Sequence, residues 1–234
     1  MIPPITSAQP EAKVSKFALV VGISNYKSFP VLRNPKNDAQ AVAQKLSKMG
    51  YKTTLLVDPN DASLTSSIRA LESQIRSTPD GSPVVFYYAG HGLEIGGKNF
   101  LFPSDANVKA PDIVGEAVPV DFILQHLSVR HATQVVILDA CRDAPIGGAD
   151  LNRGLAYMPT SEGTFIAFST APGMSALDGD GKYSPFAGAF ITELGRSDEP
   201  IESVFRNIRR AVLQATGGEQ TPWDSSSLLQ PFYL

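Results

Sequence analysis

The chain alternates short runs of apolar residues with longer segments in which apolar residues recur every three or four positions. The short runs are apolar at successive positions, which indicates strands that are buried on both faces. The longer segments have the period of amphipathic helices. Strands that alternate with helices form a mostly parallel sheet covered by helices on both faces. The pattern therefore predicts an α/β fold.

The expected elements follow from these runs. We expect strands at residues 17–23, 53–57, 84–88, 135–139 and 164–169, with a last strand at 230–234. We expect helices at about 37–49, 64–75, 120–128, 185–194 and 200–215. Ser184 is expected to cap the fourth of these helices, because a serine directly before Pro185 is typical of a helix start.

Size and charge narrow the class of protein. The chain has 234 residues and a net charge of −3, which gives no support for a nucleic-acid or membrane surface. We expect a Pro/Ser-rich arm at residues 1–15 and one domain at 16–234, acting as a monomer. No apolar run is long enough to cross a bilayer, and the first residues lack the apolar core of a signal peptide. A cytoplasmic location is favoured, and secretion or a periplasmic location stays open if the N-terminus has been trimmed.

Two reactive side chains follow neighbouring strands. In open α/β sheets, chemistry gathers at the carboxyl ends of the strands. The sequence AGHG follows the third predicted strand and ACRD follows the fourth. His91 and Cys141 are therefore expected on the same edge, as a base and a nucleophile.

A lone cysteine is more often a small core residue than a nucleophile, so this alternative needs an answer. Cys141 lies just past its strand, where backbone N–H groups of the following turn can stabilise an oxyanion. His91 lies between Gly90 and Gly92, which we expect to leave the imidazole with little side-chain cover. Because the chain has one cysteine, an internal disulfide and a zinc site built on several thiolates are excluded.

The other two histidines are poor candidates for the base. His131 precedes the fourth strand, so at ~3.3 Å per strand residue it lies about 20 Å from Cys141. His126 lies on a helix before that same edge and is interpreted as a surface or packing residue.

The segments YYAGHG and LDACRD, with the histidine 50 positions before the cysteine, resemble those of the caspase-like cysteine peptidases. Further matches to the bacterial orthocaspases and their metacaspase relatives are ALVVGISNY, LRNPKNDAQAV, SALDGDGKYSPFAGAF and QTPWDSSSL. The resemblance runs from about residue 16 to the C-terminus. It implies the caspase-like (caspase-hemoglobinase) fold, with a mostly parallel six-stranded sheet and helices on both faces.

The resemblance also implies a mechanism. Cys141 would be the nucleophile, His91 the general base and acid, and the N–H groups of Gly92 and Cys141 the oxyanion hole. Peptide bonds would be cleaved through a thioester acyl-enzyme. The sequence shows no third side chain for a catalytic triad.

Asp139 bears on specificity. Aspartate-specific members of the family carry glutamine at this position, two residues before the cysteine, and residues 139 and 141 of an extended segment share a side. In the metacaspase relatives a second aspartate follows an asparagine, which Asn37 and Asp38 match. Two carboxylates in one primary specificity pocket would select arginine or lysine before the scissile bond. Alternatively, Asp139 only caps a strand end, and Asp38 only favours a helix start.

Two departures concern the pocket and calcium. Some metacaspases have serine where this chain has Ala89, which would leave the pocket more open. Many need calcium, and the sequence DGDG at 178–181 begins like an EF-hand loop. However, Ala189 stands at the twelfth position, where that loop needs glutamate. We expect no cofactor and no metal, and a calcium requirement is not favoured.

Self-cleavage is a further prediction. Residues 145–159 are expected to form an exposed connection, which is a preferred site of nicking. Arg153 is the first candidate for the cleaved residue and Lys182 the second. The alternative is an uncut surface loop.

Two other classes of function compete with a peptidase that acts on protein or peptide substrates with basic residues. One is a catalytically silent caspase-like domain that acts in binding or as a scaffold; the presence of both His91 and Cys141 speaks against it. The other is a small-molecule hydrolase or nucleotide binder. That class ranks last, because the chain has neither a phosphate loop nor a nucleophile-elbow serine. No nucleic-acid or membrane partner is expected.

Overall fold

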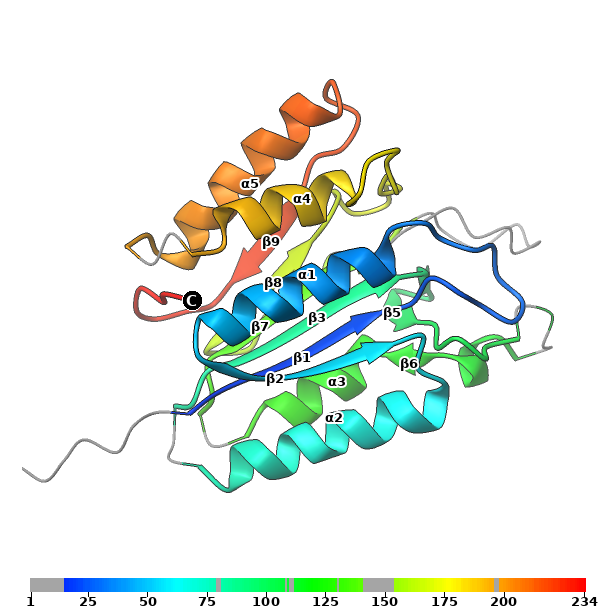
Figure 1. Ribbon diagram of the computed structural model, residues 1–234. Coiled ribbons are helices and arrows are strands. Elements are labelled where there is room, and N and C mark those ends of the chain that lie inside the picture. Colours follow the sequence, from blue (N-terminus) through cyan, green and yellow to red (C-terminus); the bar gives the residue numbers. More distant parts are fainter. Residues whose placement is uncertain are drawn as a thin grey trace, which may run out of the picture.

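The computed structural model describes residues 15–78, 81–107, 109, 112–129, 131–140, 154–195 and 198–234. A six-stranded sheet in the order β2-β1-β3-β7-β8-β9 forms its centre, with helices on both faces (Figure 1). The strands are β1 (Lys16–Gly22), β2 (Tyr51–Val57), β3 (Val84–Gly90), β4 (Gly92–Ile95), β5 (Lys98–Leu101), β6 (Val118–Pro119), β7 (Gln134–Ala140), β8 (Thr164–Phe168) and β9 (Trp223–Ser226). The helices are α1 (Pro35–Lys48), α2 (Asp61–Arg76), α3 (Val120–Leu127), α4 (Pro185–Glu193), α5 (Ile201–Ala215) and the short 3-10 helix η1 (Val114–Glu116).

Alternation along the strands divides the core into two layers. Phe86 and Tyr88 of β3 pack with α2 and α3, whereas Val85 and Tyr87 pack with α1, α4 and α5. Figure 1 shows α1, α4 and α5 above the sheet and α2 and α3 below it. Every residue of β3 and β7 is buried, as expected for central strands of a parallel sheet.

The predicted α/β class and the mostly parallel six-stranded sheet are confirmed. Strands β1, β2, β3, β7 and β8 pair in parallel and lie within two residues of their predicted bounds. Their carboxyl ends therefore meet at one edge of the sheet, which we call the carboxyl edge. The opposite edge, where these strands begin, is the amino edge.

The position of the last strand was predicted wrongly. The sixth strand is β9, which runs antiparallel to β8, and residues 230–234 form no helix or strand. The apolar residues near the C-terminus serve packing instead: Phe232 packs against the core layer of α4 and α5, and its carbonyl accepts a hydrogen bond from Ile201 N at 2.8 Å. Side chains of α5 hold β9: Arg209 pairs with Asp224 and donates to the carbonyl of Pro222, just before the strand, and Glu202 accepts from Ser226 Oγ.

A second, antiparallel sheet of β4, β5 and β6 was not predicted. Its strands are two to four residues long, too short to give a periodic signal. This small sheet begins at Gly92, directly after His91, so it fixes the direction in which the chain leaves β3.

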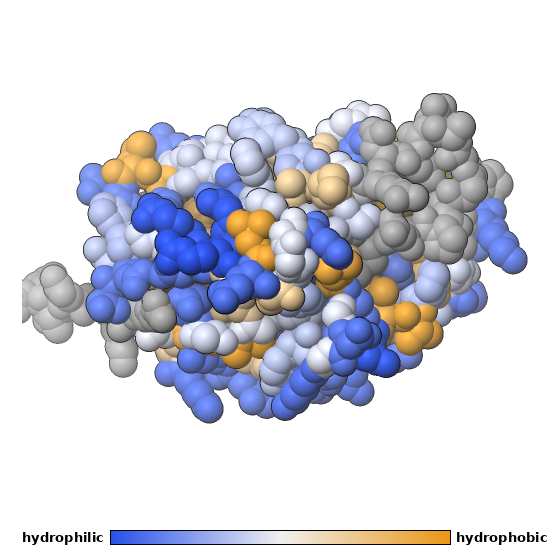
Figure 2. Space-filling view, turned by 90° about the horizontal axis from the view of Figure 1, so that it is seen from above, coloured by the Kyte–Doolittle hydropathy of each residue, from blue (hydrophilic) through white to orange (hydrophobic). Residues whose placement is uncertain are grey.

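The outer surface over α4 and α5 is mostly hydrophilic, with small separate hydrophobic areas (Figure 2). No helix in the described parts of the chain has the length and apolar character needed to span a membrane. Apart from Ser15, the expected N-terminal arm lies outside the described residues.

Candidate active site

The carboxyl edge brings the ends of β3 and β7 side by side. Gly90 and Ala140 are paired across the two strands. In the sequence, His91 directly follows β3 and Cys141 directly follows β7. Cys141, the predicted nucleophile, lies outside the described residues, so its thiol has no described position. His91 is fully described and occupies the predicted edge.

His91 is clamped through its backbone by two tyrosines. Its N–H donates to the Tyr26 hydroxyl at 2.8 Å, and its carbonyl accepts from the Tyr88 hydroxyl at 2.8 Å. Burial raises the pKa of Tyr88 well above that of an ordinary phenol, so this hydroxyl remains a donor. Tyr26 comes from the loop after β1 and Tyr88 from β3. The backbone of His91 is therefore fixed from two separate elements.

The expectation that His91 has little side-chain cover was wrong. Only 1% of the residue is exposed, and its ring packs against Tyr26 and Phe29, with ring centroids 4.7 and 5.2 Å away. The flanking glycines serve this close packing. A Cβ on Gly90 would lie 2.5 Å from the Tyr26 hydroxyl, and one on Gly92 would lie 3.0 Å from the Ala140 Cβ.

A main-chain group sets the protonation of the His91 ring. Nε2 lies 2.9 Å from the Pro30 carbonyl oxygen. Because a carbonyl oxygen can only accept, Nε2 must carry a hydrogen, which leaves Nδ1 as the nitrogen that can take up a proton. Sequence reasoning missed this partner because every residue has a carbonyl, and no residue type signals its use.

Gly92 presents its N–H on the outer side of β4. The Phe102 N–H donates to the His91 carbonyl at 3.1 Å, so Gly92 and Leu101 form a non-hydrogen-bonded pair of the antiparallel sheet. In such a pair the N–H of Gly92 points away from β5. Glu94, two residues on, follows the same rule and donates outward to the Gly154 carbonyl at 3.1 Å.

Asp38 and Asp139 meet at one residue, Ser184. Both aspartates are 0% exposed, although they lie on α1 and β7. Ser184 N–H donates to Asp38 Oδ1 at 3.1 Å, and Ser184 Oγ donates to Asp139 Oδ2 at 2.7 Å. The structure thus brings the two predicted specificity residues together.

Ser184 also caps helix α4, as predicted. Its Oγ accepts from Ala187 N at 3.0 Å. Its link to both aspartates was missed, because sequence signals only the cap. The carboxylates therefore contribute to the local fold as well, which keeps the alternative capping roles of Asp38 and Asp139 open.

The turn that carries DGDG packs against the start of α1. The Asp178 carboxylate accepts from Arg33 N at 2.7 Å and from Asn34 N at 3.4 Å, while Asn34 Nδ2 donates to the Asp178 carbonyl at 2.6 Å. Asp178 therefore holds the turn beside Asp38. Among the described residues, no group of three or more His, Cys, Asp or Glu side chains is arranged to hold a metal ion. Independence from calcium remains a prediction.

The two candidate cleavage sites differ in their surroundings. Arg153 lies outside the described residues. Just after it, residues 154, 155 and 158 are buried, so the expected exposed connection is wrong there, whereas Tyr157 is 55% exposed. Leu155 is 2% exposed, and the Asn99 side chain makes two hydrogen bonds to the Ala156 backbone at 2.7 and 2.8 Å. Lys182 is exposed, and its Nζ lies 5.1 Å from the Tyr183 ring centroid.

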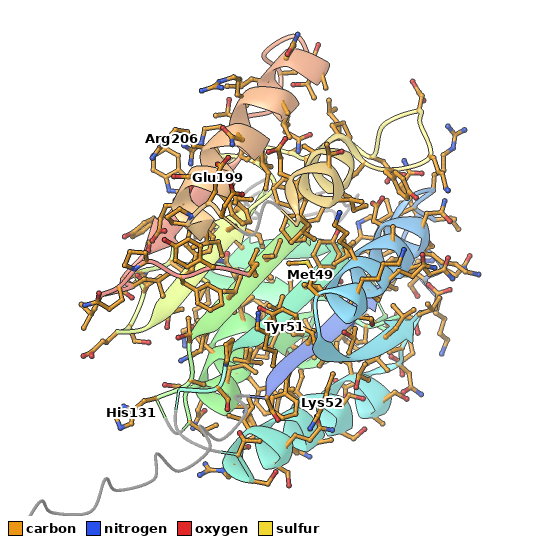
Figure 3. All side chains as sticks on the ribbon, turned by 60° about the vertical axis from the view of Figure 1, so that its left-hand side comes forward. Met49, Tyr51, Lys52, His131, Glu199 and Arg206 are labelled. Atoms are coloured by element: carbon orange, nitrogen blue, oxygen red, sulfur yellow. The ribbon has the colours of Figure 1, made fainter. Side chains whose placement is uncertain are left out.

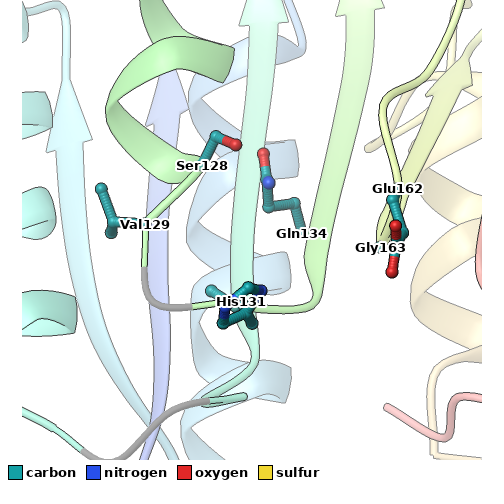
Figure 4. A pocket seen from close by; sticks show the side chains of 7 residues that line it. Ser128, Val129, His131, Gln134, Glu162 and Gly163 are labelled. Atoms are coloured by element: carbon teal, nitrogen blue, oxygen red, sulfur yellow. The ribbon is translucent and has the colours of Figure 1, made fainter.

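The other histidines lie away from the carboxyl edge, as predicted. His131 precedes β7 and projects outward at the amino edge, where β2 begins at Tyr51 (Figure 3). It lines a pocket of about 370 Å³ together with Gln134 and Glu162 (Figure 4). His126 packs on α3, where its Nδ1 lies 2.8 Å from the Phe122 carbonyl.

Comparison with known proteins places this geometry in a family. A family model for the caspase domain matches residues 15–233. Mucosa-associated lymphoid tissue lymphoma translocation protein 1 of Homo sapiens is 30% identical over 138 residues, which are 58% of this chain and 16% of that protein. A probable protease of a Desulfuromonadales bacterium is 25% identical over 196 residues, or 70% of this chain and 24% of that protein. The chain thus spans less than a quarter of the length of these relatives.

Proposed function

The chain belongs to the caspase-domain family, and we propose that it is a cysteine endopeptidase that cleaves after arginine or lysine. The observation that carries the proposal is the His91 ring, whose Nε2 hydrogen is held by the Pro30 carbonyl so that Nδ1 is left as a base. The only cysteine of the chain, Cys141, directly follows β7 in the sequence, and β7 pairs with β3, the strand that directly precedes His91.

The reaction proceeds in two halves. Cys141 Sγ attacks the carbonyl carbon of the scissile bond as its proton passes to His91 Nδ1. The oxyanion accepts hydrogen bonds from the N–H groups of Gly92 and Cys141. The intermediate collapses to a thioester, and the leaving amine takes the proton from His91. His91 then deprotonates a water molecule, which attacks the thioester and releases the new carboxyl end together with free enzyme.

The outward N–H of Gly92 supports the oxyanion hole. Gly92 and Leu101 are a non-hydrogen-bonded pair, so the Gly92 N–H makes no hydrogen bond to β5. A donor already fixed in place needs no reorganisation as the charge develops.

The pair Asp38 and Asp139 supports the basic specificity. Burying one carboxylate is costly, and placing two on a single serine is more so. A substrate guanidinium or ammonium group would neutralise both. Arginine offers the better match, since its planar group can donate to two carboxylates at once.

Labelling would test the proposal directly. A peptidyl-arginyl chloromethyl ketone should alkylate Cys141 and abolish cleavage of an arginyl substrate, whereas the matched aspartyl reagent should not. Peptide mapping by mass spectrometry identifies the modified residue. Equal labelling by both reagents would refute the basic specificity. No labelling by either would favour a silent binding or scaffold domain.

A further inference from the structure

The loop after β1, residues 24–33, surrounds His91 with three of its members. Tyr26 accepts the His91 N–H, Phe29 stacks on the imidazole, and the Pro30 carbonyl accepts from Nε2. All three contacts come from outside the strand that precedes His91. The orientation of the ring therefore depends on where this loop is held.

Asp58, the residue directly after β2, holds the start of the loop. Its Oδ1 accepts from Ser24 N at 2.7 Å and from Asn25 N at 3.0 Å. Its Oδ2 accepts from Asn25 Nδ2 at 2.7 Å. The N–H of Asp58 also donates to the Gly22 carbonyl at 2.9 Å. One residue thus ties the end of β1 and the first two residues of the loop to β2.

The backbone of Asp58 is in an unusual conformation. Its φ is +48°, in the left-handed region that costs most residues free energy and that aspartate and asparagine tolerate better than most. In this conformation the carboxylate reaches the N–H groups of Ser24 and Asn25. The loop is closed further along by the bond from Leu32 N to the Ser24 carbonyl at 2.9 Å. Ser24 therefore bonds both to Asp58 and to the far end of the loop.

We propose that Asp58 is a positioning residue for His91. By fixing Ser24 and Asn25, it keeps the Pro30 carbonyl on Nε2 and so maintains the tautomer in which Nδ1 is free of hydrogen. Asp58 has no described contact with His91 and acts through the loop. Its effect on turnover rests on the proposed peptidase function, whereas its effect on the tautomer does not.

Three variants separate positioning from stability. Asp58→Gly removes the carboxylate and keeps the left-handed backbone without steric strain. Asp58→Asn keeps an oxygen for the two backbone donors and also tolerates this conformation. Asn60→Ala is the matched control. Asn60 lies two residues away and accepts a hydrogen bond from Ser63 N at 2.9 Å as the cap of α2, and it has no described contact with the loop.

The first readout is the tautomer of His91, measured by two-bond ¹⁵N–¹H NMR correlations at a pH where the ring is neutral. His91 should have its hydrogen on Nε2. His126 is an internal reference of the opposite kind, because its Nδ1 must donate to the Phe122 carbonyl. Loss of signals in His91→Gln assigns the spectrum. The second readout is kcat and KM for a fluorogenic arginyl peptide.

In Asp58→Gly we expect mixed tautomers of His91, unchanged His126 signals, and a kcat about tenfold lower with KM within about twofold of wild type. Asp58→Asn should restore most of both readouts, because it keeps the acceptor for Ser24 N and Asn25 N and loses only the acceptor for Asn25 Nδ2. Asn60→Ala should lower Tm without changing either.

A wild-type His91 pattern in folded Asp58→Gly would overturn the proposal, as would the same tautomer change in Asn60→Ala. If Asp58→Gly does not fold, Asn25→Ala takes its place, because it removes only the exposed bond to Oδ2. That variant should show a smaller change in the same direction, and no change would count against the proposal. A wild-type protein that cleaves no peptide would refute the proposed function but leave the NMR result to judge Asp58.

Discussion

The carboxyl and amino edges of the same sheet treat polar side chains in opposite ways. At the carboxyl edge, His91, Asp38, Asp139 and Ser184 are each at most 1% exposed, and hydrogen bonds connect them to segments far away in sequence. At the amino edge, His131 and Glu162 are exposed beside an open pocket (Figure 4). Both edges contain a histidine and a carboxylate, so composition alone does not separate them.

The difference lies in the free energy of burial, which is unfavourable for the polar groups of the carboxyl edge. Burial of charged or strongly polar groups is unfavourable unless hydrogen bonds compensate, so a buried and connected polar cluster needs a reason. Exposed polar groups at the end of a sheet need none. The contrast between the two edges therefore supports the proposal that the chemistry takes place at the carboxyl edge.

The largest effect is expected at Cys141. Cys141→Ala should lower kcat/KM for arginyl peptides by more than about a thousandfold, because no other thiol can form the acyl-enzyme. His91→Gln should do the same, since an amide cannot act as the base. His91→Ala is a poorer test, because removing a buried ring beside Tyr26 and Phe29 leaves a cavity. Circular dichroism and Tm verify that each variant folds, and appreciable cleavage by Cys141→Ala would refute the mechanism.

The next effect is expected at the aspartates. Asp139→Asn keeps the side-chain shape and an acceptor for Ser184 Oγ but removes the charge. If Asp139 binds the substrate cation, kcat/KM for arginyl peptides should fall about ten- to a hundredfold, as expected for loss of one charge-assisted partner. Asp38→Asn should act alike, and the double variant should be worse than either.

The same substitution tests the capping alternative. If Asp139 only supports the cap of α4, Asp139→Asn should retain wild-type turnover, because its oxygen still accepts from Ser184. Asp139→Ala would then lower Tm rather than selectivity. Matched arginyl, lysyl and aspartyl peptides, measured alongside thermal unfolding, separate the two roles.

The sequence predicted the elements whose signal is strong. Strands such as Val84–Gly90 are continuous apolar runs, and α2 repeats its apolar residues with the helical period. The strand β9 and the small sheet of β4–β6 gave no such signal. Strand β9 contains Asp224 and two serines, and it pairs because Phe165–Phe168 of β8 offers an open edge.

In the candidate site, the sequence could identify functional side chains but not functional backbone groups. His91, Asp38 and Asp139 could be identified from the motifs in which they stand. The Pro30 carbonyl could not, because it is a backbone group brought in by a loop. The cover over His91 was misjudged for a related reason: glycines next to a residue indicate either access or close packing, and only the tertiary contacts decide.

Self-cleavage would divide the chain into two fragments, and we expect a smaller effect on its activity. If the wild-type protein cuts after Arg153, intact-mass measurement should find two fragments, and both Cys141→Ala and Arg153→Gln should remain whole. The fragments should stay together in gel filtration, because β8 of the second pairs with β7 of the first and α4 packs beside α1. Turnover of Arg153→Gln compared with wild type then reports whether the cut matters. Identical masses of wild type and Cys141→Ala would refute self-cleavage, and a cut at Lys182 would move the site to the exposed turn.

The smallest effect is expected at the amino edge, and it is the sharpest check on the contrast between the edges. His131 has a φ of +52°, a conformation that costs a residue with a side chain about 1–2 kcal/mol and glycine almost nothing. Glycine loses about 0.5–1 kcal/mol more backbone entropy on folding, so His131→Gly should raise the free energy of unfolding by about 0.5–1 kcal/mol. Because His131 lies at the opposite edge from His91, kcat/KM for arginyl peptides should stay within about twofold of wild type. Urea unfolding and peptide kinetics on the same preparations measure both quantities. A loss of turnover comparable to that of Asp139→Asn would show that the amino edge takes part in the reaction, and the assignment of the chemistry to the carboxyl edge alone would then be wrong.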